Sequence, residues 1–304
     1  MQRAALALAL ASVGGLLVGA AVPSAEHLRQ FALVSLFVQT MIAVGGLAEA
    51  HSDVAAGWPL RMFLTHHAVS SIPLMALGVV LGLGTPLGAG TFLLGAVPPA
   101  VALPSYAAAC AGRVRPVVQF CILSYAVGIV LTPLLVLVAL GTTGRIGSMV
   151  LTLLFGLMLP ATLGTLTGRW LRRVPQGASF AIIAASVSVL MLGMGSELRL
   201  AYEVALEQPS QLWIAALIGV GRCLWGASLG WVVGRGGSLQ VESALAGGCK
   251  NAVLAAVIAH AAVGSLAALP ALLGLFAEAG VLFAASVLSV RSRSRPLPPP
   301  SDIW

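Results

Sequence analysis

The chain has 304 residues, of which 59% are hydrophobic and only 8% are charged, and its mean hydropathy is +1.02. About a quarter of the residues in a soluble domain are charged, so this composition excludes a water-soluble protein and predicts a surface that faces lipid. The net charge of +7 comes from basic residues that stand mostly singly between apolar segments. Nucleic acid requires a clustered basic patch, so no nucleic-acid partner is expected. The four cysteines fall within apolar segments, which indicates free thiols.

Ten apolar segments follow one another with short connections, and each is close to the roughly 20 residues that a membrane span needs. They lie at about 4–22, 30–50, 61–83, 87–112, 115–141, 147–168, 178–197, 209–234, 239–263 and 267–290. The first segment also has the pattern of a cleavable signal peptide, which is the alternative to a retained span. The stretch 291–304 is basic and then proline-rich, and we expect it to be a cytoplasmic tail.

The two halves of the chain contain matching segments. Segments two and seven start about 148 residues apart, as do segments three and eight. This constant offset predicts two copies of one five-helix repeat, at 1–145 and 146–290. Because each copy holds an odd number of helices, the second must insert upside down relative to the first. The expected fold is therefore an all-α membrane protein of about ten transmembrane helices in two inverted repeats.

The arginines are distributed unequally between the two sides that this arrangement creates. Eleven lie on one side: Arg3, Arg61, Arg113, Arg115, Arg169, Arg172, Arg173, Arg235, Arg291, Arg293 and Arg295. Three lie on the other: Arg29, Arg145 and Arg199. Cytoplasmic loops carry an excess of Lys and Arg. We therefore expect a multi-pass protein of the cell (plasma or inner) membrane with both termini in the cytoplasm.

Two of the segments are poor helices, and they occupy the same place in each half. The fourth contains Pro98, Pro99 and Pro104, and the ninth has Gly247 and Gly248 near its middle. Irregular backbone at membrane depth is tolerated where it lines a cavity or is packed in protein. A matched pair of interrupted spans is typical of a transporter's binding site, the alternative being two kinked helices without a ligand.

Three ionisable residues lie near the centres of the last three segments: Arg222, Lys250 and Glu278. Each is costly at the middle of a bilayer unless it is paired or hydrated. Glu278 can neutralise one of the two cations, and the remaining positive charge would attract an anionic substrate. The alternative is a structural charge pair with an arginine that reaches to the membrane edge. His66 and His67 are interpreted as interfacial residues at the cytoplasmic face.

Two stretches of the chain resemble a known family. Residues 86–99 are Pro-Leu-Gly-Ala-Gly-Thr-Phe-Leu-Leu-Gly-Ala-Val-Pro-Pro, and residues 248–259 are Gly-Cys-Lys-Asn-Ala-Val-Leu-Ala-Ala-Val-Ile-Ala. The stretch 59–105, which contains the first run, resembles the third and fourth spans of the bile acid:sodium symporter family, and the second run resembles its ninth span. The resemblance implies a panel domain and a core domain, with crossed, broken helices that hold substrate and ions. It also implies organic-anion substrates, usually carried with sodium.

The chain departs from this family's pattern at the positions that serve sodium. The family's ninth span has a glutamate and a glutamine where this chain has Ala246 and Lys250. In the fourth-span break, Ser105 beside Tyr106 is the obvious ligand, so a sodium site is possible near Ser105 and Asn251. A lysine ammonium at a sodium position would replace the ion electrostatically. We therefore expect the loss of at least one sodium site, leaving proton coupling through Lys250 or uniport.

The expected function is secondary active transport of a small organic anion by alternating access, coupled to sodium or protons, with no other cofactor. An efflux carrier of the auxin-carrier or arsenite type shares this architecture and is the alternative, as is a non-transporting membrane scaffold. An enzyme is not expected, because the spans contain no His-Glu-x-x-His motif and no aspartate. No pattern typical of a channel filter is present either.

Overall fold

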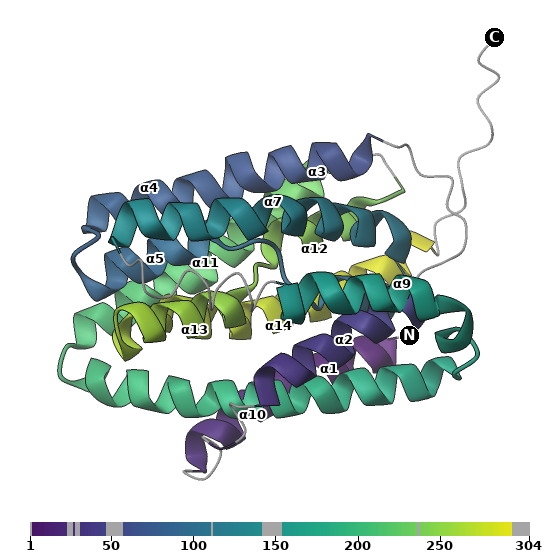
Figure 1. The fold of residues 1–304 in the computed structure, drawn as a ribbon, viewed down its shortest axis with the longest axis horizontal. Coiled ribbons are helices and arrows are strands. Elements are labelled where there is room, and N and C mark those ends of the chain that lie inside the picture. The colour runs from purple at the N-terminus through teal and green to yellow at the C-terminus, as the bar shows by residue number, and fades with distance from the viewer. Residues whose placement is uncertain are drawn as a thin grey trace.

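The structure, a computed structural model, describes residues 2–22, 27, 31–46, 57–110, 112–141, 154–235 and 238–293. This part of the chain is helical, and its β-structure is one bridge between Pro99 and Lys250 (Figure 1). In the first half the helices are α1 (Gln2–Ala21), α2 (Ala32–Gly46), α3 (Trp58–His66), the π-helix η2 (His67–Ser71), α4 (Ile72–Leu81), α5 (Pro86–Ala96), α6 (Leu103–Ala109) and α7 (Val114–Leu140). In the second half they are the π-helix η3 (Leu154–Met158), α9 (Leu159–Leu171), α10 (Gln176–Leu206), α11 (Pro209–Val233), α12 (Gln240–Gly248), α13 (Ala252–Ala262) and α14 (Ser265–Arg293).

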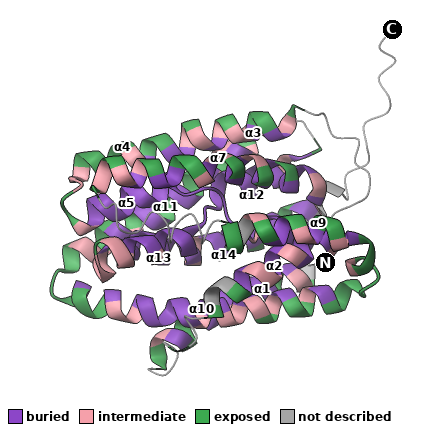
Figure 2. Cartoon of the chain, viewed as in Figure 1, coloured by how far each residue is buried: buried purple, intermediate pink, exposed green. Residues whose placement is uncertain are grey.

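Six of the described helical segments are long and apolar enough to cross a membrane. They are Arg3–Ala21, Trp58–Leu81, Val114–Leu140, Gln176–Leu206, Pro209–Val233 and Ser265–Ser289. Their outer faces carry large exposed apolar side chains such as Val80, Trp213 and Leu217, whereas Arg222, Lys250 and Glu278 are buried (Figure 2). In a soluble protein the charged side chains lie on the surface and the large apolar ones inside, so this arrangement is the reverse. The chain is therefore an all-α integral membrane protein.

Each predicted apolar segment corresponds to a helix or to a pair of short helices. The fourth and ninth are pairs, α5 with α6 and α12 with α13. The seventh is longer than predicted, because α10 continues past residue 197, the predicted end of the segment, to Leu206 and includes Glu203. The number of membrane crossings and the inverted repeat remain predictions. The boundary between the repeats, with Arg145, and residues 294–304 of the tail lie outside the described residues.

The helices pack in two groups. In one, α1 packs on α10, α10 on α2, and α2 on α9. The other group joins α4 with α5, α11 with α12, and α14 with α5, α11 and α13. Small residues allow the helix backbones to approach closely within each group: a side chain at Gly19 would collide with Leu192 of α10, and one at Gly90 with Ala267 of α14. The groups meet chiefly where α14 contacts α10 and α1.

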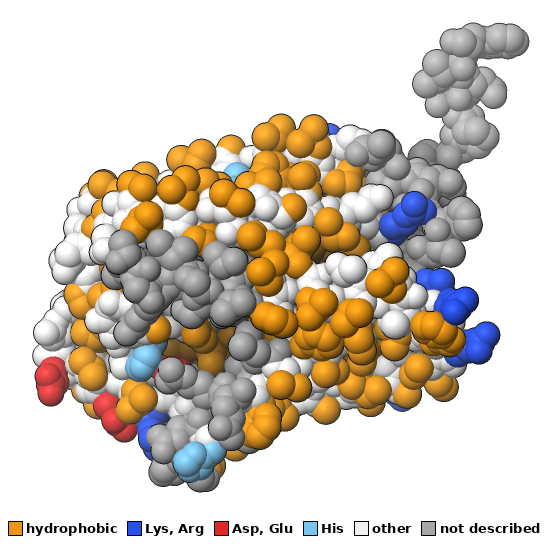
Figure 3. All heavy atoms as spheres, in the orientation of Figure 1, with side chains coloured by type: hydrophobic (Ala, Val, Ile, Leu, Met, Phe, Trp, Pro, Cys, Tyr) orange, Lys and Arg blue, Asp and Glu red, His pale blue; other side chains and the backbone are white. Residues whose placement is uncertain are grey.

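Charged side chains gather at opposite ends of the bundle. Basic side chains cluster at the end where α9 is followed by α10, and acidic ones at the end where α10 is followed by α11 (Figures 1 and 3). The flank between them is covered by apolar side chains (Figure 3). This distribution suits helices that run from one membrane surface to the other.

Candidate functional site

The two interrupted helices cross at their breaks. The first break runs over residues 97–102 between α5 and α6, and the second over residues 249–251 between α12 and α13. At the crossing, the backbone N–H of Asn251 donates to the carbonyl oxygen of Pro98 at 3.0 Å, and that of Ala100 donates to the carbonyl oxygen of Cys249 at 3.3 Å. These bonds satisfy backbone groups that no helix satisfies, in the buried interior of the protein.

The local sequence explains why each helix stops. Pro98 and Pro99 have no N–H to donate and cannot continue α5, while Pro104 occupies the first turn of α6, where proline is favoured. At the second break, Gly247 lets α12 lie directly against α11, since any side chain there would collide with Gly226. Asn251 then begins α13, its Oδ1 accepting from the N–H of Leu254 at 3.1 Å.

The Lys250 ammonium is held inside this crossing. Its Nζ donates to the carbonyl oxygens of Gly95 and Val97, both at 2.9 Å, and to Ser71 Oγ at 2.8 Å. The residue is only 1% exposed. An ammonium has three N–H groups, so these bonds use all of them. Gly95 and Val97 close α5, where the helix dipole is negative, so Lys250 supplies the positive charge that this helix end favours.

An ion pair supports the second break from the other side. Arg222 Nη2 lies 2.5 Å from Glu278 Oε1, and both side chains are 4% exposed. The same carboxylate oxygen accepts the backbone N–H of Lys250 at 3.1 Å, and Arg222 Nη1 donates to the carbonyl oxygen of Gly248 at 3.2 Å. With Lys250 included, this cluster holds two cations and one anion. It therefore carries one surplus positive charge at the centre of the molecule.

Further carbonyl groups beside the breaks also accept hydrogen bonds from side chains. At the end of α12, His66 Nδ1 donates to Ala246 at 2.8 Å and Ser70 Oγ donates to Gly247 at 3.2 Å. Beside the first break, Thr132 Oγ1 donates to Ala96 at 2.8 Å and the Tyr125 hydroxyl to Ala100 at 3.0 Å.

These donors are residues that the sequence analysis did not assign to the site. Ser70, Thr132 and Tyr125 gave only a weak signal, as hydroxyl groups in largely apolar segments, and so did Ser71, which accepts from Lys250. The interfacial interpretation of His66 is wrong. The residue is 1% exposed and lies within the continuous helical stretch Trp58–Leu81, against the end of α12.

A small cavity of about 30 Å³ lies beside the crossing. One side of it is lined by Tyr106 of α6, by Lys250 and Asn251 of the second break and by Glu278 of α14. The other side is lined by Gln39 of α2 together with residues of α10. It is large enough for about one water molecule. The cavity therefore lies between the two helix groups, next to the surplus charge.

The structure brings most of the predicted site residues together. Pro98, Pro99, Gly247, Gly248, Lys250, Asn251, Arg222 and Glu278 share the network at the crossing, and Tyr106 joins them at the cavity. Pro104 shapes the start of α6. Ser105 is buried, does not line this cavity, and its hydroxyl makes no hydrogen bond within the described part of the chain.

Comparison with known proteins adds no family to these observations: no protein-family model matches the chain, and no curated protein matches it. Fold and site together define an integral membrane protein of helices with two crossing helix breaks around a buried charge cluster.

Proposed function

We propose that this protein is a secondary active transporter that carries a small organic anion across the membrane by alternating access. The observation that carries the proposal is the crossing of two broken helices around the buried Lys250. Secondary transporters bind substrate near the bilayer midplane, at discontinuous helices whose ends supply charge and hydrogen bonds. The surplus positive charge of Lys250, Arg222 and Glu278 favours an anion at this place.

The packing of the helices supports alternating access. The cavity at the crossing is bounded by α2 and α10 on one side and by the crossed helices on the other. Movement of one group past the other would open this cavity first toward one surface and then toward the other. We further propose ten spans in two inverted repeats, with the basic end of the bundle and both termini in the cytoplasm. The resemblance to the bile acid:sodium symporter family favours the same arrangement.

The contacts of Lys250 bear on coupling. In carriers with broken helices, unwound carbonyls and half-helix ends can coordinate a sodium ion. Here the carbonyl oxygens of Gly95 and Val97 accept from the Lys250 ammonium instead. We propose that this ammonium replaces a coupling ion at the first break, so that transport is coupled to protons through Lys250. Uniport, which would not be active transport, is the alternative.

Proteoliposomes test the proposal. Purified protein is reconstituted, and uptake of labelled mono- and dicarboxylates and sulfonates is measured with an imposed sodium gradient, with a proton gradient and with neither. We expect saturable uptake of at least one anion class, lost in Lys250→Met and retained in Glu203→Gln, which changes an exposed carboxylate far from the crossing. Uptake no greater than in protein-free liposomes for every anion would reject the transporter. Uptake that strictly requires two sodium ions would reject only the proposal that the Lys250 ammonium replaces a coupling ion.

A further inference from the structure

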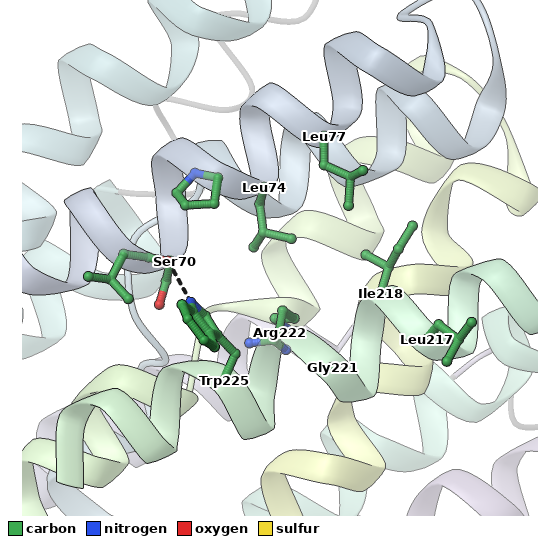
Figure 4. A pocket seen from close by; sticks show the side chains of 10 residues that line it. Ser70, Leu74, Leu77, Leu217, Ile218, Gly221, Arg222 and Trp225 are labelled. Atoms are coloured by element: carbon green, nitrogen blue, oxygen red, sulfur yellow. Dashed lines mark hydrogen bonds between the residues drawn. The ribbon is translucent and has the colours of Figure 1, made fainter. Parts of the chain in front are cut away.

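A groove on the flank of the molecule has a charged floor. Its volume is about 350 Å³, and it lies between α4 with η2 on one side and α11 on the other (Figure 4). Leu74 and Leu77 line it from α4, facing Leu217 and Ile218 of α11 (Figure 4). Arg222 lies at its floor. The walls are thus hydrocarbon and the floor carries a guanidinium.

The groove opens on the lipid-facing side of α11. Leu217 is 73% exposed and Trp225 is 58% exposed, and both lie on a helix long and apolar enough to span the membrane. Trp225 bridges part of the groove, its Nε1 donating to the carbonyl oxygen of Val69 at 3.3 Å, the dashed line in Figure 4. A molecule dissolved in the bilayer can therefore reach the groove without passing through water.

One N–H group of the buried Arg222 guanidinium is unpaired among the described residues. Its Nη groups bind Glu278 and the carbonyl oxygen of Gly248, while its Nε makes no hydrogen bond within the described residues. Its charge is paired with Glu278, but the cluster that also contains Lys250 holds two cations and one anion. An anion that enters the groove would complete the balance of charge.

A second groove provides the contrast. It has about 470 Å³, lies between α11, α12 and α14, and is lined by Leu224, Trp231, Val281, Leu288 and other described residues, none of which is charged. A hydrocarbon chain can lie in either groove. Only the chemistry of the α4–α11 groove, with a cation under an apolar wall, distinguishes an acid from a neutral molecule of the same shape.

We propose that the α4–α11 groove is a binding site for a single-chain aliphatic carboxylic acid, with its carboxylate against Arg222 and its chain between α4 and α11. The volume is near the lower end of the roughly 300–1,000 Å³ of small-molecule pockets, which suits one chain rather than the two of a phospholipid. Arg222 lies near the middle of α11, whereas a phospholipid phosphate stays at the membrane surface. A weak acid can enter the groove uncharged and ionise beside the guanidinium.

Fluorescence quenching tests this site without any assay of transport, so its outcome is separate from that of the proposed function. Two variants of the full chain retain a single tryptophan, either Trp225 in the α4–α11 groove or Trp231 in the α11–α14 groove. Each is titrated in nanodiscs with 9,10-dibromostearic acid and with its methyl ester. We expect the acid to quench Trp225 saturably at concentrations at least tenfold lower than the ester, and the two probes to quench Trp231 alike.

Two further variants locate the effect. Gly221→Phe places a ring in the groove, where a side chain at this glycine meets no atom within 4 Å, and should abolish saturable quenching of Trp225. The matched control is Gly280→Phe on α14, where a side chain also meets no atom within 4 Å. It should leave the quenching of Trp225 unchanged. The double variant Arg222→Gln with Glu278→Gln should abolish the preference for the acid, so that acid and ester quench Trp225 at about the same concentration.

Several outcomes would overturn the proposal. They are equal quenching of Trp225 by acid and ester, acid quenching that survives Gly221→Phe, and an acid preference that survives removal of the ion pair. Tighter saturable quenching of Trp225 by a brominated anionic diacyl lipid than by the acid would also overturn it, because the site would then belong to a lipid headgroup.

Discussion

The two helix breaks solve one problem in different ways. Both leave carbonyl groups without helical donors at a depth where water is scarce. At the first break, made by Pro98 and Pro99, neutral hydroxyl groups of Thr132 and Tyr125 act as donors. At the second, made by glycines, the donors include Arg222, which is itself held by Glu278.

Lys250 connects the two helix breaks. It belongs to the second break by sequence, yet its ammonium binds the carbonyl oxygens of Gly95 and Val97 at the first. The two half-helix ends therefore cannot separate without breaking charged hydrogen bonds. The ammonium carried by the second break therefore fixes the position of the first, which would let the crossed helices move as one body.

The largest effect is expected from Glu278→Gln, which leaves Arg222 and Lys250 as neighbouring cations without a counter-charge. We expect the free energy of unfolding in mixed micelles to fall by about 3–5 kcal/mol, the usual cost of breaking a buried pair. The double variant Arg222→Gln with Glu278→Gln should lose clearly less. If the double variant loses as much as the sum of the single variants, the pair does not act as a unit and the contrast between the breaks weakens.

Lys250→Met should have the next largest effect on stability. Two buried carbonyls of α5 lose their donor at about 1–3 kcal/mol each, partly offset because an ammonium no longer has to be buried, so we expect a loss of about 2–4 kcal/mol. The measurement is the same unfolding titration. A loss below about 1 kcal/mol would mean that Lys250 does not join the two breaks.

Two hydroxyl groups at the crossing differ in the charge of their hydrogen-bond partner. Ser71 accepts from a charged group and Thr132 donates to a neutral carbonyl, so Ser71→Ala should cost about 1.5–3 kcal/mol and Thr132→Val about 0.5–1.5 kcal/mol. Both are read as changes in unfolding free energy against the exposed control Glu203→Gln, for which we expect no measurable change. The reverse order would show that the neutral bond of Thr132 contributes more to the crossing than the charged bond of Ser71.

The smallest effect is expected from Asn251→Ala, which removes the side-chain cap of α13 but none of the charged contacts. A lost N-cap typically costs about 1 kcal/mol. Asn251→Asp retains the accepting oxygen and should restore the helix end, although it adds a charge beside Lys250. Equal losses for both variants would indicate that the side chain acts elsewhere than at the cap.

The sequence predicted much of the helical framework for a simple physical reason. Long apolar stretches have few alternatives in lipid, and prolines and glycines mark helix ends directly, as at Pro98 and Gly247. It also indicated Arg222, Lys250 and Glu278, because a charge in an apolar segment has no inexpensive place except the interior.

The partners of these groups were not predictable. Nothing in the sequence pairs Ser71 with Lys250, which are 179 positions apart. The position of His66 near the start of its segment suggests an interfacial residue, and only the packing of α12 against it shows that the residue is buried. The length of α10 was also underestimated. Glu197 marks the predicted end of the segment, yet it lies within α10, where it is buried with its Oε2 2.8 Å from His260 Nδ1 on α13.

The most direct test of the central claim is a thermal-shift measurement on purified wild type and Lys250→Gln, in sodium chloride and in choline chloride at equal ionic strength. If the Lys250 ammonium stands in for a coupling ion, sodium should stabilise Lys250→Gln, by about 2.7 kcal/mol at a hundred times its dissociation constant, and leave the wild type unchanged. Stabilisation of the wild type by sodium, together with tighter binding of an organic anion, would contradict the account and identify a sodium symporter.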